Sequence, residues 1–563
     1  MELGKLKKKN KTFELIFILI ISLIFSLVLF KSNIYAGGHD LTFHLNRLVG
    51  ICDAFEDGQI LPKIYPYSNN GFGYASPLFY CDLFLYPFAL LYKLGVSLIV
   101  TYKVLLLCLS FGTSTIVFYC AKKVFKRNLT PYTATMLYVF SSYHFYDVYA
   151  RAAIGETFGI MFTPLVLYSI YKILVLKKND YILLGISFSC LVMSHLISAL
   201  LIGIVFALCI MIYIINNKKR KQEILNTLLC IVKGTALALL LCAWFILPML
   251  EQMHSQKFYL NIVDQTFDVN SSTCSIKTIF SLFARLDING KNINSVISIG
   301  ILLLIIPVIY TFIKKNSIIN LCLFFVFISF LFILGVFRLP SLLSNIQFLF
   351  RMYIIVYPLL TIVSAYVLDN INTSVVKYLT LIVIIYSLAN LTIFTTDLNQ
   401  DNNHYFSNNE SVDSIFTSNL NYNLDYNNSQ LGGGEYLPIC NNEDYLEDNL
   451  TIVVEPFNPD INIEIKEYTR NGTSIKFELD SQSEYAILPL TYYKGYCAYC
   501  DGIKIKCVED TVFAKVGIYL ESGDHEYEVK YEGTFVQKAS LILSCISFIT
   551  MLYIITKKTS NRI

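Results

Sequence analysis

Charged residues are scarce in this chain of 563 residues. Asp, Glu, Lys and Arg together make up 15% of it, and the formal net charge is only +3. So small a charge gives no support for a nucleic-acid partner. Hydrophobic residues make up 55%, including 41 Phe and 40 Tyr, which is far more apolar than a soluble globular protein. The composition therefore predicts an integral membrane protein.

About twelve apolar segments can be interpreted as membrane spans. The first, residues 13–30, is long enough to cross roughly 30 Å of hydrocarbon. A cleaved signal peptide ending at Ala36 is the alternative, but the length of the apolar run favours an uncleaved anchor. The other segments are at about 97–121, 129–145, 158–176, 181–193, 197–215, 225–249, 295–313, 317–337, 352–368, 377–396 and 538–556. We expect a polytopic α-helical membrane protein.

The basic residues indicate its orientation. When the spans alternate, the side of the N-terminus receives KKVFKR (122–127), LKK (176–178), KKRK (218–221), KK (314–315) and KKTSNRI (557–563). The positive-inside rule makes that side cytoplasmic. This placement requires residues 79–95 to lie in or dip into the outer interface without spanning. We predict a multi-pass cell-membrane protein with both termini in the cytoplasm.

The sequence divides into four predicted parts. Residues 1–396 form a transmembrane domain, with a first extracytoplasmic loop at 31–96. An Asn-rich polar linker occupies 397–449. Strand-like runs separated by NG, DG and SGD turns predict a small extracytoplasmic β-sandwich at 450–537. Residues 538–563 are the final span and a cytoplasmic tail.

The 15 cysteines decide little, because most lie in apolar spans. Cys497 and Cys500 form a CxxC pair, but an offset of three on a strand places two side chains on opposite faces. A two-residue turn at Asp501 and Gly502 would pair Cys500 with Ile503. We therefore expect neither a disulfide nor a metal site from this cysteine pair.

The first loop carries a polar cluster in GGHDLTFHLNRLVG (37–50). Apolar residues at 41, 45, 48, 52 and 55 have helical spacing, which predicts a surface helix. Asp40, His44 and Arg47 would lie along one edge of its apolar stripe. Asp40 can also be the N-cap of this helix, and Arg47 can be a snorkelling interface residue. Neither alternative excludes a functional site.

Further polar residues occur in other loops predicted on the outer side. Asp147, Arg151 and Glu156 lie between two spans, and Gln347 and Arg351 lie at the start of another. Arg151 and Glu156 could simply pair with each other, but charges close to a membrane are rare enough to suggest function. Arginine binds phosphate bidentately, and a carboxylate can take a proton from an attacking hydroxyl. The set suits a reaction on a lipid-linked phosphate. A lone His195, at a tight turn, is more typical of a helix-end hydrogen-bonding residue.

Several motifs resemble those of a known family. The order of HDLTFHLNRL, GFGYASPLFY, YARAAIGETF, MSHLISAL, AWFILPMLEQ, IQFLFR and LTYYKGYCAYCDG is similar to that in bacterial YfhO-type proteins, within the GT-C membrane glycosyltransferases. The resemblance covers nearly the whole chain. It implies a polyprenyl-phosphate-sugar-dependent glycosyltransferase that moves a sugar from undecaprenyl phosphate onto a cell-envelope polymer, such as a teichoic acid or wall polysaccharide, on the outer face.

The resemblance also implies roles for particular residues. The catalytic first-loop Asp of GT-C enzymes corresponds to Asp40, and Glu156 is the second catalytic candidate, for orienting the acceptor or a divalent ion. At IQFLFR this chain has Leu349 and Phe350 where the family pattern has Pro-Trp, which affects the expected wall of the site. The candidates for binding the substrate are His39, His44, Arg47, Arg151, His195, Gln347 and Arg351. No cofactor is required by the sequence, although Mg²⁺ or Mn²⁺ could bind.

Two other classes of function fit part of the sequence. A transporter or flippase for a lipid-linked sugar would have ionisable residues near the middle of its spans and broken helices there. This chain has few such residues and gathers its charge at one predicted face, which favours surface chemistry. A scaffold that recruits envelope enzymes through the β-domain would make the first-loop cluster dispensable.

Overall fold

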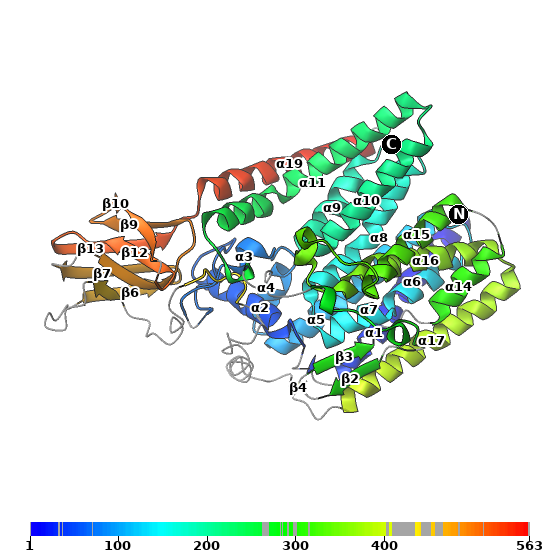
Figure 1. Ribbon diagram of the computed structural model, residues 1–563, viewed down its shortest axis with the longest axis horizontal. Coiled ribbons are helices and arrows are strands. Elements are labelled where there is room, and N and C mark those ends of the chain that lie inside the picture. The colour runs from blue at the N-terminus through cyan, green and yellow to red at the C-terminus, as the bar shows by residue number, and fades with distance from the viewer. Residues whose placement is uncertain are drawn as a thin grey trace. The chain divides into compact units, whose positions relative to one another are not determined.

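A computed structural model describes most of the chain (Figure 1). The described residues are 2–31, 34–35, 38–69, 71–261, 269–281, 283, 285–289, 292–296, 301–313, 316–400, 405–407, 434–440, 452–455, 465–481, 485–510 and 512–560. They divide into two compact units. Unit 1 comprises Met1–Thr42, Ile99–Ala238 and Phe267–Asn419, and unit 2 comprises Phe43–Leu98, Leu239–Thr266 and Leu420–Ile563.

Helices occur at every segment that the sequence predicts as a span. In the described part of the chain, eight are long and apolar enough to cross a membrane: Lys11–Leu29, Leu98–Val124, Ile154–Leu174, Leu196–Asn216, Lys221–Ser255, Leu349–Asn370, Thr373–Asp397 and Phe535–Lys558. Two shorter apolar helices are Tyr181–Ser194 and Ser317–Ile333. The prediction of a polytopic membrane protein is confirmed, whereas the number of about twelve spans stays a prediction.

Unit 1 is built almost entirely of helices, because a helix satisfies its own backbone hydrogen bonds inside hydrocarbon. Its α-helices are α1 (Glu2–Lys31), α5 (Leu98–Val124, from its second residue), α6 (Thr130–Val139), α7 (Ser142–Phe145), α8 (Ile154–Leu174), α9 (Tyr181–Ser194), α10 (Leu196–Asn216), α13 (Ile276–Ile279), α14 (Ile301–Thr311), α15 (Ser317–Ile333), α16 (Tyr353–Asn370) and α17 (Thr373–Gln400). Helix α11 (Lys221–Ser255) begins in unit 1 and ends in unit 2.

Short irregular elements join these helices. They are the π-helix η1 (Tyr146–Ala150), the 3-10 helices η2 (Val269–Ser271), η3 (Ser341–Ile346) and η4 (Leu349–Met352), and the strands β1 (Ile34–Tyr35), β2 (Arg285–Asn289), β3 (Asn292–Val296) and β4 (Tyr405–Phe406). Strand β1 pairs with β4, and β2 pairs with β3. The β1–β4 pair joins the loop after α1 to the chain that follows α17.

Polar contacts connect the ends of several helices in unit 1. Lys122, at the end of α5, forms an ion pair with Glu14, near the start of the apolar part of α1 (Lys11–Leu29). Asp369, at the end of α16, accepts the Arg127 backbone N–H at 2.7 Å. Because Lys122 and Arg127 are close in the sequence, the start of this apolar part of α1 lies at the same end of unit 1 as the end of α16. Residues that follow α1 or precede α16 consequently lie at the opposite end.

Unit 2 contains two antiparallel sheets of the predicted β-domain (Figure 1). The five-stranded sheet has the order β10-β9-β13-β7-β6, and the four-stranded sheet has the order β11-β12-β8-β5. The strands are β5 (Val453–Glu455), β6 (Ile465–Asn471), β7 (Ser474–Ser481), β8 (Tyr485–Thr491), β9 (Tyr496–Cys500), β10 (Ile503–Ile505), β11 (Cys507–Asp510), β12 (Lys515–Tyr519) and β13 (Gly523–Tyr531). Both sheets contribute to one hydrophobic cluster, which includes Phe477, Leu488, Ile518 and Tyr527. The β-rich region is confirmed in this form.

The predicted turn at the CxxC pair is confirmed. Asp501 and Gly502 have positive φ values of 48° and 78°, and Ile503 pairs with Cys500. This left-handed two-residue turn is the kind that Asp-Gly favours. Burial alternates along β9, so Cys500 is buried in the core and Cys497 lies on the other face.

The rest of unit 2 is helical. It contains α2 (Leu41–Glu56, from its third residue), α3 (Ser76–Phe79), α4 (Tyr86–Lys93), the last part of α11 and α19 (Phe535–Ser560). Helix α19 runs beside the end of α11 in Figure 1, where the Trp244 backbone N–H donates to Ser544 Oγ at 3.1 Å. Residues 79–95 hold the last residue of α3 and the short helix α4, which agrees with the prediction that this segment does not span.

Candidate active site

Unit 1 brings together charged residues from three segments that are far apart in the sequence. We call this set the carboxylate–arginine cluster; its members are Asp40, Asp147, Arg151, Glu156 and Arg351. They follow α1, precede or begin α8, and precede α16. Because these ends lie opposite the start of α1 and the end of α16, the cluster is at a single end of the helices.

Arg151 is the centre of the cluster. Its Nη1 lies 2.9 Å from Asp147 Oδ1 and 2.7 Å from Glu156 Oε2. Its Nη2 lies 3.6 Å from Asp40 Oδ2. The Arg151 side chain is only 3% exposed, so these interactions are little screened by water. One guanidinium group therefore holds three carboxylates from two separate segments.

Local backbone geometry places Arg151 there. It follows the π-helix η1, a kind of helix that often marks functional sites. The Ala152 backbone then takes a left-handed conformation, with φ of 56°, which is uncommon for a residue other than glycine. The Ala153 N–H donates to the Asp147 carbonyl at 2.8 Å, and α8 begins at the next residue. This sharp turn brings Asp147, Arg151 and Glu156 together.

Asp40 is held against the same turn by its backbone. Its N–H donates to the Arg151 carbonyl at 2.9 Å. A Cβ on Gly38 would come within 3.0 Å of Ala152 Cβ, so glycine permits this close approach. The Asp40 side chain is 39% exposed, whereas the side chains of Arg151 and Glu156 are nearly buried. Asp40 also directly precedes α2, so its position suits both a helix cap and a reactive carboxylate.

Arg351 reaches Glu156 from the other side. Its Nε lies 3.5 Å from Glu156 Oε2, and its Nη1 donates to Gln347 Oε1 at 2.8 Å and to the Ile346 carbonyl at 2.9 Å. Gln347 has a φ of 63°, a second strained residue beside an arginine of the cluster. The structure therefore brings the predicted Gln347 and Arg351 to Glu156.

Sequence reasoning missed Tyr143, whose hydroxyl donates to Glu156 Oε1. A tyrosine in an apolar segment carries no signal that it faces a carboxylate thirteen residues later. The Glu156 carboxylate is thus contacted by the side chains of Tyr143, Arg151 and Arg351.

Burial raises the pKa of Asp147 well above its usual range, and the charge of Glu156 raises this pKa further, whereas the charge of Arg151 lowers it.

Some buried polar atoms of the cluster have no hydrogen-bond partner among the described residues. They are Asp147 Oδ2, Arg151 Nε and Arg351 Nε. Buried polar atoms are rarely left unpaired in proteins, because losing water without a replacement partner is costly. A polar ligand that brings both acceptor and donor atoms would satisfy them.

Aromatic rings cover both arginines. The Arg151 Cζ lies 5.2 Å from the centre of the Phe350 ring, and the Arg351 Cζ lies 5.3 Å from that of Phe348. These distances allow cation–π attraction. Phe350, at the position where the resemblance to YfhO-type proteins predicts Trp, presents an aromatic face to Arg151.

His39 and His195, two of the candidates for binding the substrate, lie in unit 1 and differ in their surroundings. His39 is exposed and adjacent to Asp40. His195 is buried and caps α10, accepting the Ser198 N–H at 3.3 Å through Nδ1. A Cβ on Gly159 would lie 2.9 Å from Ser198 Oγ, so this glycine lets the cap pack against α8 one turn after Glu156. His195 is thus the helix-end residue that its lone occurrence suggests.

His44 and Arg47 belong to unit 2, where they form another polar group. Arg47 Nη2 lies 2.7 Å from Asp82 Oδ1, and Arg47 Nη1 lies 3.0 Å from His44 Nδ1. The Tyr65 hydroxyl donates to Asp82 at 2.5 Å. Because the side chains of Arg47 and Asp82 are each 2% exposed, the snorkelling interpretation of Arg47 is wrong. Asp82, a single acid in the apolar run FYCDLFLY, was missed; its isolation there was the available signal.

Comparison with known proteins shows the family of this chain. Residues 78–397 match the family described as "6-pyruvoyl-tetrahydropterin synthase related domain; membrane protein". The chain belongs to this family. The matched region includes Asp147, Arg151, Glu156 and Arg351, and it begins after Asp40. The family description supports the membrane location, which the apolar helices also indicate.

A relative from Lactococcus lactis subsp. cremoris (strain MG1363) is named "Uncharacterized protein". It is 24% identical over 259 residues, which make up 45% of this chain and 42% of the relative. The chain thus spans less than half the length of this relative.

Proposed function

We propose that this protein is a membrane glycosyltransferase of the GT-C type, similar to YfhO-type proteins, that moves a sugar from undecaprenyl phosphate onto a cell-envelope polymer. The observation that carries the proposal is the carboxylate–arginine cluster. Three carboxylates and two arginines from distant segments meet at one end of the membrane helices, and Asp40 is the member with a substantially exposed carboxylate. If the new glycosidic bond forms beside that carboxylate, the lipid tail of the donor would stay among the helices.

Asp40 acts as the general base in this proposal. It takes the proton from an acceptor hydroxyl, whose oxygen attacks the anomeric carbon of the donor while the bond from that carbon to the phosphate oxygen breaks. Polyprenyl phosphate leaves with the bonding electron pair. Arg151 holds Asp40 in place through the backbone hydrogen bond and the contact between Nη2 and Oδ2. The exposed position of His39 puts it where an incoming substrate would pass.

The arginines would neutralise the phosphate. Arg351 is better suited than Arg151, because Arg151 is already occupied by two carboxylates at hydrogen-bonding distance. Arg351 instead uses one Nη for neutral acceptors, and its Nε, 3.5 Å from Glu156 Oε2, has no hydrogen-bond partner among the described residues. Glu156 would then orient Arg351 or the acceptor, and Gln347 would hold the arginine side chain.

A divalent cation is compatible with the charges but not demanded by them. The cluster has three carboxylates and two guanidinium groups, so one negative charge is in excess if all are ionised. A proton on Asp147 would remove it. In the described part of the chain, the only group of three side chains close enough to share an ion lies in unit 2. Mg²⁺ or Mn²⁺ in the cluster would therefore need donor phosphate oxygens as additional ligands.

The proposal is tested by assaying the purified full-length protein in detergent. Undecaprenyl phosphate esters of a hexose and of an N-acetylhexosamine serve as donors, with isolated wall polymer as acceptor. We expect release of undecaprenyl phosphate that depends on the acceptor. Failure to release it with any donor, together with movement of the donor across the bilayer of reconstituted vesicles, would favour a flippase. The absence of both activities would favour a scaffold.

Arg351→Lys tests the phosphate contact. We expect the donor KM to rise about 10- to 100-fold, because lysine keeps the charge but loses the planar fork of donors. The initial rate over a range of donor concentrations measures it. Arg285→Lys is the matched control, since Arg285 in unit 1 is 60% exposed and forms an ion pair with Asp397 at 3.0 Å. An unchanged donor KM in Arg351→Lys would remove this residue from the site.

Membrane orientation is tested with single new cysteines. In the proposed topology, the β-domain and the cluster face outward and both termini face the cytoplasm. Cysteine at Asp524, which is exposed in the β-domain, should react with a membrane-impermeant thiol reagent in intact cells. Cysteine at Lys219, in the exposed loop before α11, should react only after the cells are opened. The unmodified chain supplies the background, and the opposite labelling pattern would contradict an outward-facing site.

A further inference from the structure

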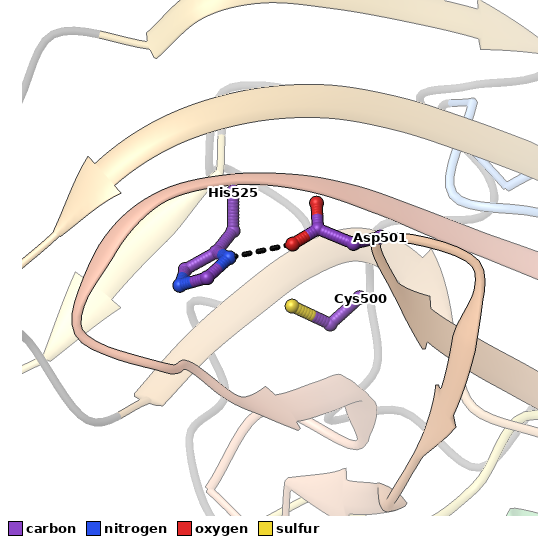
Figure 2. A group of neighbouring side chains, drawn as sticks. All are labelled: Cys500, Asp501 and His525. Carbon is purple, nitrogen blue, oxygen red and sulfur yellow. Dashed lines mark hydrogen bonds and ion pairs between the residues drawn. The ribbon is translucent and has the colours of Figure 1, made fainter.

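We propose that Cys500, Asp501 and His525 of the β-domain bind a transition-metal ion, best suited to Zn²⁺. One ligand atom from each residue lies within 4.8 Å of the other two. Figure 2 shows the three side chains converging where β9 turns into the next strand. This site is independent of the carboxylate–arginine cluster and of the proposed glycosyl transfer.

Strand register places the sulfur and the imidazole on the same face. Cys500 pairs directly with Tyr527 of β13. His525 lies two residues before Tyr527, and residues two apart on a strand share a face. The side chains of Cys500 and His525 are therefore neighbours across the two strands, although 25 positions separate them in the sequence. The CxxC pattern alone could not reveal this partner.

The turn supplies the third ligand. The left-handed conformation of Asp501 folds its side chain back toward β13, where Oδ1 accepts the Glu526 N–H at 3.0 Å and Oδ2 lies 2.7 Å from His525 Nδ1 (Figure 2). Asp501 N–H also donates to the Glu526 carbonyl at 2.8 Å. A bound ion would replace the contact between Oδ2 and Nδ1 while the backbone bonds keep the turn in place.

The surrounding charge favours a cation. Glu521 interacts electrostatically with both Cys500 and His525, and Asp501 does the same. Glu521 is exposed and its backbone N–H is held by the Tyr527 hydroxyl at 2.9 Å. It is therefore close enough to the site to attract an ion.

The donor set indicates which ion. Thiolate, imidazole and carboxylate are the three side-chain ligand types of zinc, whereas Mg²⁺ and Ca²⁺ prefer oxygen alone. Tetrahedral bonds of about 2.0 to 2.3 Å require ligand atoms about 3.5 Å apart. Small rotations of the exposed Asp501 and the partly exposed His525 would close the present spacing to that value. Three protein ligands leave a fourth position for water or Glu521.

Cobalt binding to the full-length protein in detergent tests the proposal. Co²⁺ replaces Zn²⁺ in such sites, and its bond to a thiolate produces an intense near-ultraviolet absorption band. The protein is reduced, freed of reductant and metal, and titrated with Co²⁺ without oxygen. We expect a band that saturates at one Co²⁺ per chain and disappears when Zn²⁺ is added.

Three variants and one control locate the ligands. Cys500→Ser should abolish the band, and His525→Gln should raise the apparent Kd for Co²⁺ at least about tenfold, as loss of a ligand exceeds loss of a supporting contact. Asp501→Asn should also weaken binding while keeping the turn, because Asn-Gly forms the same turn as Asp-Gly. Cys497→Ser is the matched control, since Cys497 is on the opposite face and contacts Lys504 Nζ at 3.2 Å.

The outcomes separate clearly. A band that persists in Cys497→Ser and is lost or weakened in the other three supports the site. No cobalt–thiolate band in the wild-type protein, or an unchanged band in His525→Gln, overturns it. His525 is partly exposed, so its substitution should leave the β-domain folded, and an unchanged thermal unfolding profile without metal verifies this. The sugar-transfer assay is not involved, so failure here leaves the proposed function untouched.

Discussion

Replacing Asp40 by Asn is expected to lower the rate of the proposed sugar transfer about a hundredfold or more, while expression and membrane insertion stay unchanged. Asn caps a helix about as well as Asp but has no proton-accepting carboxylate. The substitution also leaves Arg151 its two closer partners, Asp147 at 2.9 Å and Glu156 at 2.7 Å. The loss of activity should therefore come from the chemistry and not from unfolding. Transfer rates at saturating donor and acceptor measure it.

Asp53→Asn is the matched control, because Asp53 is a partly buried carboxylate on α2, the helix that Asp40 directly precedes. It should transfer sugar at about the wild-type rate. His39→Gln should reduce transfer less than Asp40→Asn if His39 only meets the incoming substrate. Sugar transfer by the Asp40→Asn protein at the wild-type rate would mean that Asp40 is only a helix cap. The base would then have to be sought at Glu156 or Asp147.

Arg151→Ala is expected to lower the free energy of unfolding by about 3–5 kcal/mol, the range typical when one partner of a buried ion pair is removed. Arg151 is 3% exposed and faces Asp147 and Glu156, which are 0% and 2% exposed. Its removal leaves those two carboxylates buried with less compensation, although Arg351 remains near Glu156. Denaturant or thermal unfolding of the detergent-solubilised protein measures the loss.

A compensated variant separates stability from function. Arg151→Met combined with Asp147→Asn and Glu156→Gln removes both buried negative charges and should regain much of the lost stability, yet it should not transfer sugar. Arg220→Ala is the control, because Arg220 is 69% exposed and its ion pair with Glu223, which is 32% exposed, should contribute under about 1 kcal/mol. Wild-type stability of Arg151→Ala would mean that the ion pairs of the cluster contribute little net free energy.

Local patterns explain which features could be predicted. The apolar segments became helices because only a helix satisfies its backbone in hydrocarbon, and alternation in runs such as SIKFELD became strands. The pairing of Cys500 with Ile503 followed from the turn preference of Asp-Gly. Each of these depends on residues close together in the chain.

Partners from distant segments were the part that local patterns could not predict. Arg47 was interpreted as a snorkelling residue because its partner, Asp82, lies 35 positions later. Tyr143 and the orientation of Phe350 were missed for the same reason, since apolar segments of this kind contain many aromatic residues. The metal site that we propose likewise depends on His525, which only the pairing of β9 and β13 brings to Cys500.

The amino-acid sequence by itself determined that this is a membrane protein, where its helices and strands form, and which polar residues depart from the apolar pattern. These properties follow from composition, periodicity and turn preference, which act within a few residues. The tertiary structure alone decided which of those polar residues meet. It brings Asp40 close to Arg151 and Arg351 close to Glu156. It places His44 and Arg47 in a separate group around Asp82. The physical reason is that a buried charge must find an opposite charge or a hydrogen bond, and the packing of distant segments determines which partner is within reach.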